Sequence, residues 1–231
     1  MKKAILTIDD VPSNNTKAIV DYLNEKDITV VMFAVGEQLE KKPENAIYAL
    51  QRGMILGNHS YTHPQFSSLT LEESKQEIEK CEEQLDRIYQ MAGVERKYRP
   101  FRFPYGDKGG QNKDDLQEFL KEKGFDKLDD SQIPYSWWKE SGLDKDIDTL
   151  WTFDFAEYNI RRGNDFTAED VFKRINDPDP TSGAAILADG GYHFILFHAH
   201  DETEELVPGY HRLFIDYLLE HGVTFDRPKF K

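Results

Sequence analysis

The chain has 231 residues, of which 39% are hydrophobic and 13% aromatic, and its formal net charge is −14. That length accommodates one large α/β domain or two small ones, and the composition is that of a globular rather than a disordered protein. The negative charge disfavours nucleic acid as a partner, because phosphates would be repelled, and a neutral or cationic substrate fits better. The same charge would also serve solubility alone.

No stretch is long and apolar enough to span a bilayer, and the single cysteine, Cys81, excludes an internal disulfide bond. The apolar run at residues 4–8 is too short for a signal peptide. We therefore expect a cytoplasmic protein for the sequence as written, or a secreted or periplasmic one if an export signal has been removed. The oligomeric state stays open.

Strand and helix patterns alternate from one end of the chain to the other. Short apolar, β-branched runs predict strands at residues 3–8, 28–35, 54–56, 98–103, 149–153, 192–197 and 223–225. Helical spacing of apolar residues, with capping residues at several starts, predicts helices at about residues 15–26, 43–53, 70–91, 113–123, 167–175 and 210–221.

This alternation predicts parallel strands joined by crossover helices. A single barrel-like α/β domain is the preferred architecture, and an open doubly wound sheet is the alternative. Two turn-rich stretches, at residues 125–148 and 176–191, stand outside the alternation. Long loops in a compact domain are often functional.

Two adjacent carboxylates, Asp9 and Asp10, stand at the end of the first predicted strand. Adjacent side chains on a strand point to opposite sides, so beyond its end one carboxylate can bind a cation while the other faces a water molecule. An ordinary acidic turn would contain the same pair.

His59 and His63 are four residues apart in a segment that Gly57 and Asn58 mark as a loop. Side chains four apart share a face where the backbone makes a helical turn, so both imidazoles could reach one metal ion. Pro64 predicts that this turn ends at His63, because a residue before proline avoids the helical region. Two polar loop histidines are the plain alternative.

One aspartate with two histidines leaves coordination positions open for water and substrate, as in catalytic zinc sites. Non-haem iron oxygenases use a similar set and are a competing enzyme class. That alternative gives no role to two other residues at predicted strand ends, Arg102 and His198. With the acids of residues 151–158, these groups all fall at the C-terminal ends of predicted parallel strands, where α/β barrels carry their active sites.

These blocks, in this order, resemble the polysaccharide deacetylases of carbohydrate esterase family 4, which contain the NodB-homology domain. The resemblance runs from Thr7 to His198 and is most specific in the His-Ser-x-x-His pattern of residues 59–63, preceded by the apolar stretch 31–36. It implies a distorted (β/α) barrel of about seven parallel strands, with one catalytic domain over residues 1–231. It also implies a divalent metal ion, for which zinc is the first choice and cobalt, nickel or manganese are alternatives.

The resemblance assigns roles to matching residues. Asp10, His59 and His63 would be the metal ligands, Asp9 the catalytic base, and Arg102 the residue that orients this base.

On the other side of the reacting bond, the resemblance makes His198 the general acid. The backbone amide of Tyr105 would help to hold the oxyanion, and Leu196 would line the pocket for the acetyl methyl group.

The fourth block departs from the family pattern, in which Asp-x-x-Asp-Trp is usual. Here Asp154 is followed by Glu157 and Tyr158, so either acid could support His198, and the pocket wall has a smaller ring. Val11 also stands where the family usually has glycine.

We therefore expect a metal-dependent hydrolase that removes N-acetyl groups from an amino-sugar polymer or oligosaccharide, of the chitin-oligosaccharide or peptidoglycan type. A related metal-dependent amidase acting on a small non-sugar amide is the first alternative, and a sugar-binding protein without turnover is another. The aromatic residues of the loop 131–138 could stack on sugar rings or pack over the barrel.

Overall fold

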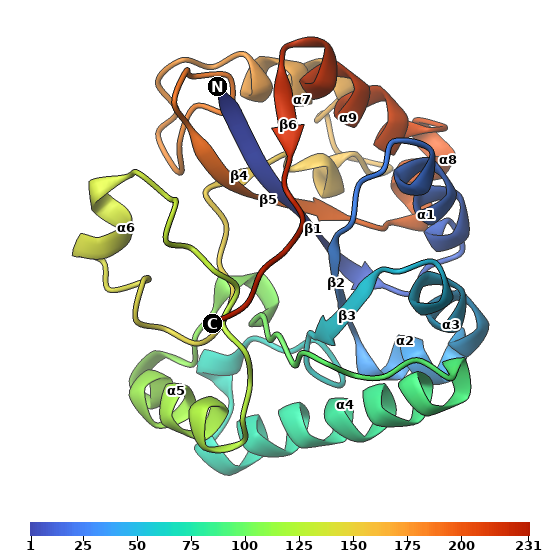
Figure 1. Ribbon diagram of the computed structural model, residues 1–231, viewed down its shortest axis with the longest axis vertical. Coiled ribbons are helices and arrows are strands. Elements are labelled where there is room, and N and C mark those ends of the chain that lie inside the picture. Colours follow the sequence, from blue (N-terminus) through green and yellow to red (C-terminus); the bar gives the residue numbers. More distant parts are fainter.

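The computed structural model describes residues 1–231 and contains one parallel sheet with helices around it (Figure 1). Its strands are β1 (Lys2–Val11), β2 (Val31–Ala34), β3 (Ile55–Asn58), β4 (Phe153–Asp154), β5 (Tyr192–His198) and β6 (Val223–Phe225). They follow the order β3–β2–β1–β5–β4, and β6 pairs with the first residues of β1. Every pairing is parallel, which confirms the predicted α/β class.

Isolated contacts bring the two edges of the sheet together. Phe101 forms a parallel bridge with Asn58 at the end of β3, and the amide of Thr149 donates to the carbonyl of Phe101 at 2.8 Å. The strand predicted at residues 98–103 is reduced to this bridge, because Pro100 has no amide to give to a ladder. The strand predicted at residues 149–153 is likewise reduced to the short β4. About seven segments therefore form a distorted barrel without a continuous ladder on one side.

The six predicted helices are present, with shifted boundaries, and three short helices were not predicted. The helices are α1 (Thr16–Glu25), α2 (Gly36–Lys41), α3 (Pro43–Gln51), α4 (Leu71–Ala92), α5 (Lys113–Glu122), α6 (Ser136–Glu140), α7 (Ala168–Ile175), α8 (Asp201–Leu206) and α9 (Tyr210–Glu220). The capping box of Thr70 and Glu73 is formed at the start of α4. None of the helices combines the length and hydrophobicity that a bilayer crossing requires.

Alternation along β1 divides the core in two. Leu6 and Ile8 belong to a cluster of 37 buried residues between the sheet and its helices, whereas Ile5 belongs to a smaller cluster on the other face. The long stretch 125–148 contributes Ile133 and Trp138 to the smaller cluster. This part of the predicted functional loop therefore packs over the sheet, because its apolar side chains cover the face that the helices leave open.

The backbone of β3 is closely packed at Gly57, two residues before His59. A Cβ atom added at Gly57 would lie 2.8 Å from the carbonyl oxygen of Pro100 and 3.0 Å from a ring carbon of Phe33. Both neighbours are held by the sheet, so they cannot move away freely.

We predict that Gly57→Ala lowers the free energy of unfolding by about 1–3 kcal/mol through overpacking. Urea denaturation would measure this change, with the exposed Ser141→Ala as a control expected within about 0.5 kcal/mol of wild type. If the two variants unfold at the same urea concentration, β3 and the Pro100 segment are not packed this closely.

Candidate active site

Strand β1 carries both acids, because it continues past Ile8 to Val11. The register with β2 shifts between these two residues, and Asp10 has a φ of 64°. Such a bulge breaks the alternation of side chains along a strand. As a result Asp9 and Asp10 line the same cavity, where a regular strand would turn them to opposite faces.

Asp9 is held by a fully buried arginine, Arg102. Nη1 of Arg102 donates to Oδ1 of Asp9 at 2.7 Å and to the hydroxyl of Thr7 at 2.8 Å. Nε of Arg102 donates to the carbonyl of Thr149 at 2.9 Å. The second oxygen of Asp9 lies 3.4 Å from Nε2 of His59. Sequence reasoning gave Thr7 no role, although it stands two residues before Asp9 and so on the same face of β1.

The two histidines of the His-Ser-x-x-His pattern do meet, but the predicted helical turn between them is wrong. Residues 59–63 form no helix, and Ser60 and His63 have φ values of 63° and 61°. The amides that a helical turn would use are bonded elsewhere. The carboxylate of Glu77, on α4, accepts hydrogen bonds from the amides of Tyr61 at 3.1 Å and Thr62 at 2.7 Å.

Asp10, His59 and His63 have the arrangement that a divalent ion needs. Oδ1 of Asp10 lies 3.3 Å from Nε2 of His63 and 3.8 Å from Nε2 of His59, and the three ligand atoms fall within 4.8 Å of one another. Two ligands bound at about 2.1 Å and separated by a tetrahedral angle are about 3.4 Å apart. Nδ1 of His59 lies 2.8 Å from the carbonyl of Arg102, which fixes a tautomer with Nε2 free to bind a metal. These residues therefore fit a divalent metal ion.

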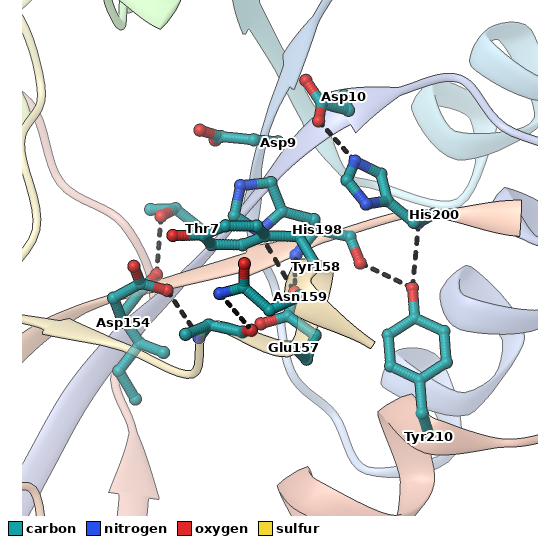
Figure 2. A network of polar contacts seen from close by, with 12 residues as sticks. Thr7, Asp9, Asp10, Asp154, Glu157, Tyr158, Asn159, His198, His200 and Tyr210 are labelled. Carbon is teal, nitrogen blue, oxygen red and sulfur yellow. Dashed lines mark hydrogen bonds and ion pairs between the residues drawn. The ribbon is translucent and has the colours of Figure 1, made fainter. Parts of the chain in front are cut away.

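His198 ends β5 directly beside Asp9 on β1 and lines the same cavity as the candidate metal-binding residues. The buried Glu157 holds it: Oε1 accepts from the backbone amide of His198 at 2.5 Å and lies 3.1 Å from Nδ1 of its ring. Asp154 instead accepts the amide of Ala156 at 2.7 Å, within its own turn (Figure 2). Of the two acids left open by the sequence, Glu157 is the one in contact with His198.

The surroundings of these groups shift their pKa values in different directions. Burial opposes protonation of His198, but the carboxylate of Glu157 outweighs it and raises the pKa of His198 to about 9. Burial, together with the charge of Glu157, raises the pKa of Asp154 to about 6. Burial and the neighbouring His59 lower the pKa of His63 to about 4, so that its imidazole is neutral and able to bind a metal at neutral pH.

The predicted substrate-contacting residues surround one cavity of about 610 Å³. Tyr105 is 64% exposed at its edge, and Leu196 is buried in its wall. Tyr158 packs the edge of its ring against His198, with 4.7 Å between ring centroids. The cavity also contacts residues to which the sequence gave no role, namely Trp151, Arg161, His200, Asp201, Glu202 and Thr203.

Figure 2 shows two residues that sequence reasoning missed, His200 and Tyr210. His200 contacts Asp10 through its ring, and the Tyr210 hydroxyl bonds the backbone on either side of Ala199. A signal for His200 was present, because it follows His198 by two residues and side chains two apart along an extended chain share a face. No comparable signal marked Tyr210, which comes from α9.

Comparison with known proteins agrees with this geometry. The family model described as polysaccharide deacetylase matches residues 1–127, more than half of the chain. The chain belongs to the polysaccharide deacetylase family. The matched residues include the two acids of β1, both histidines of the candidate metal-binding set and Arg102.

Curated relatives within this family align with part of the chain. A peptidoglycan-N-acetylglucosamine deacetylase of Bacillus cereus is 35% identical over 103 residues, which are 44% of this chain and 36% of the relative. Chitin deacetylase 1 of Cryptococcus neoformans is 34% identical over 102 residues, which are 44% of this chain and 21% of the relative. The alignments thus span about a third or less of these relatives.

Solved structures share the polysaccharide deacetylase fold over nearly the whole chain. The catalytic domain of a peptidoglycan N-acetylglucosamine deacetylase from Eubacterium rectale superposes with a TM-score of 0.66 at 15% identity, covering 98% of this chain and 88% of that one. The peptidoglycan deacetylase PdaC of Bacillus subtilis gives a TM-score of 0.60 at 22% identity, covering 97% and 86%. A mutant of a pseudoenzyme of carbohydrate esterase family 4 gives 0.59 at 21% identity, covering 97% and 64%.

We predict that Glu157→Gln lowers the pKa of His198 from its wild-type value of about 9, because burial remains while the carboxylate that raises this pKa most is lost. Asp154→Asn is the matched control and should leave His198 close to its wild-type pKa. An NMR titration of the histidine ring signals in metal-free protein would measure both values.

The sign of the accompanying stability change follows from the same shift. Because the folded-state pKa of His198 is the higher one, its pairing with Glu157 stabilises the fold fully below about pH 6.5. This contribution is lost as the pH rises through about 9.

If Asp154→Asn lowers the pKa of His198 as much as Glu157→Gln does, Glu157 is not the partner of His198.

Proposed function

We propose that this chain is a metal-dependent hydrolase that removes N-acetyl groups from an amino-sugar polymer or oligosaccharide. One observation carries the proposal: a single cavity combines the Asp10, His59 and His63 set with an arginine-held carboxylate, Asp9, and a carboxylate-held histidine, His198. Hydrolysis of an amide needs a proton acceptor for the attacking water and a proton donor for the departing amine, and this cavity contains a candidate for each.

The metal ion is proposed to be zinc, with cobalt, nickel or manganese as substitutes. Two imidazoles and one carboxylate are donors that suit zinc, and three protein ligands leave a position open. A bound divalent ion supplies Lewis-acid activation of water and of a carbonyl oxygen.

Asp9 is proposed as the catalytic base. Its Oδ1 is held by Arg102, while Oδ2 faces the cavity 3.4 Å from Nε2 of His59 and is free to take a proton from the attacking water. The arginine fixes the direction of the carboxylate, so that the proton acceptor does not have to be ordered during the reaction.

His198 is proposed as the general acid. The pKa of about 9 keeps the ring protonated at neutral pH, and an amine leaves readily only when it is protonated. The backbone amide of Tyr105 is proposed to stabilise the oxyanion, and Leu196 to contact the acetyl methyl group. Both residues line the cavity.

An N-acetylated saccharide is proposed as the substrate because relatives named as peptidoglycan and chitin deacetylases each align with 44% of this chain. The family match over residues 1–127, which include Asp9, the candidate metal-binding set and Arg102, supports the same substrate class. Residues 1–231 are proposed to act as one catalytic domain. The large core cluster supports this, because its members run along the sequence from Ala4 to Val223.

A related amidase acting on a small non-sugar amide is the second candidate. The block from Asp154 to Tyr158 favours it, because Tyr158 gives the cavity wall a smaller ring than the usual tryptophan. Binding of a sugar without turnover is the third candidate, since the fold also occurs in a pseudoenzyme. Sugar binding alone would not require the Arg102–Asp9 and Glu157–His198 contacts.

We predict that the zinc-loaded protein releases acetate from chito-oligosaccharides or N-acetylated peptidoglycan fragments faster than from small acetamides. Asp9→Asn and His198→Ala should each lower kcat by about 10²- to 10⁴-fold, as loss of a general base or acid does. The exposed Asp165→Asn and His221→Ala are matched controls and should retain the wild-type rate. Removal of the ion by a chelator should abolish acetate release, and zinc should restore it.

Other outcomes select among the candidates. Faster turnover of small amides than of saccharides would favour the second candidate. Tight saccharide binding without acetate release would favour the third. Near wild-type turnover by Asp9→Asn or His198→Ala would remove the role proposed for that residue.

A further inference from the structure

His200 is a partly buried histidine that lines the cavity. Neither the sequence analysis nor the proposed mechanism gives this residue a role. It lies between the end of β5 and the start of α8, and its side chain is 25% exposed. Its Nε2 atom lies 2.6 Å from Oδ2 of Asp10 (Figure 2). This is slightly shorter than the roughly 2.7–2.9 Å that is usual for a charge-assisted hydrogen bond from nitrogen to a carboxylate.

The backbone of His200 is fixed independently of that contact. The hydroxyl of Tyr210 accepts from the amide of His200 at 3.1 Å and donates to the carbonyl of His198 at 2.6 Å. Tyr210 is fully buried and stacks on Phe197, with ring centroids 5.1 Å apart. Nδ2 of Asn15 also donates to the carbonyl of His200, at 3.4 Å. The ring of His200 therefore projects from an ordered segment.

Asp10, in contrast, has no partner such as the arginine that holds Asp9. Its two oxygens have different surroundings: Oδ2 contacts His200, whereas Oδ1 faces Nε2 of His63 at 3.3 Å and Nε2 of His59 at 3.8 Å. A carboxylate without such a contact can rotate and lose its alignment with the other two ligands. Partners of this kind orient metal ligands in many proteins.

We propose that His200 is a positioning residue of the metal centre, which donates from Nε2 to Oδ2 of Asp10 and so leaves Oδ1 as the single oxygen ligand. This inference rests on the metal site of the proposed function. In this arrangement Tyr210, on α9, holds the backbone of His200, and the ring of His200 in turn holds Asp10, the proposed metal ligand on β1.

The test is the metal affinity of the stripped protein, measured with zinc against a chromophoric chelator. His200→Ala should weaken zinc binding by about 10- to 100-fold, as loss of an outer-shell partner does. His200→Gln should bind zinc more nearly as wild type does, because its side-chain amide can donate to the same oxygen. His221→Ala, at an exposed histidine, is the matched control and should bind as wild type does.

A spectrum separates positioning from direct ligation. Cobalt-loaded His200→Gln should keep the visible absorption of the wild-type protein, because the set of ligands is unchanged. Thermal unfolding of the metal-free variants checks that each is folded. Zinc binding by His200→Ala as tight as that of wild type would overturn the proposal.

Two further results would also overturn it. Equal losses of affinity in His200→Gln and His200→Ala, with an altered cobalt spectrum, would make the ring itself a ligand. A folded wild-type protein that binds no divalent ion would remove the metal site altogether. Because affinity is measured without substrate, a protein that binds zinc through this network and releases no acetate would contradict the proposed function alone.

Discussion

Arg102, whose guanidinium is buried, is the residue on which the rest of the site depends. The guanidinium donates to Asp9 at 2.7 Å, and the backbone carbonyl of Arg102 lies 2.8 Å from Nδ1 of His59. A charge removed from water destabilises the fold strongly unless it is paired, so the Asp9 carboxylate must stay in place for Arg102 to stay buried. One residue thereby fixes both the direction of the proposed base and the tautomer of His59, a proposed metal ligand.

Parallel pairing then determines which groups can meet. Asp9 lies beside His198 in the register of β1 and β5, and Asp154 lies beside Leu196 in that of β4 and β5. The bridge between Asn58 and Phe101 places Arg102 next to the start of the histidine loop. Strands therefore determine the positions of these residues. Residues in the left-handed region, such as Asp10 and Ser60, determine the directions in which the chain leaves the strands.

These two contributions differ in how far sequence predicts them. Periodicity predicted the six longer helices and most strands, and strand ends alone were sufficient to collect Asp9, Arg102 and His198 at one rim. The bulge at Asp10 and the irregular loop from His59 to His63 were not predictable, because they arise from hydrogen bonds between distant residues. Glu77 on α4, sixteen residues beyond Tyr61, binds the loop amides. The contact of His198 with Glu157 likewise depends on a turn that no local pattern describes.

The proposed mechanism needs histidines in opposite protonation states within one cavity, and the balance between burial and neighbouring charges differs between the two histidines accordingly. Glu157 is fully buried beside His198 and raises its pKa to about 9, despite burial. His63 also lies beside a carboxylate, Asp10, but burial and the neighbouring His59 outweigh it and lower the pKa of His63 to about 4. Divergent pKa values among neighbouring groups are the usual mark of divided acid and base roles. A protonated imidazole, suited to donate a proton, and a neutral imidazole, suited to bind a metal ion, can therefore coexist at neutral pH. The residue type alone would not ensure this difference, because both groups are histidines.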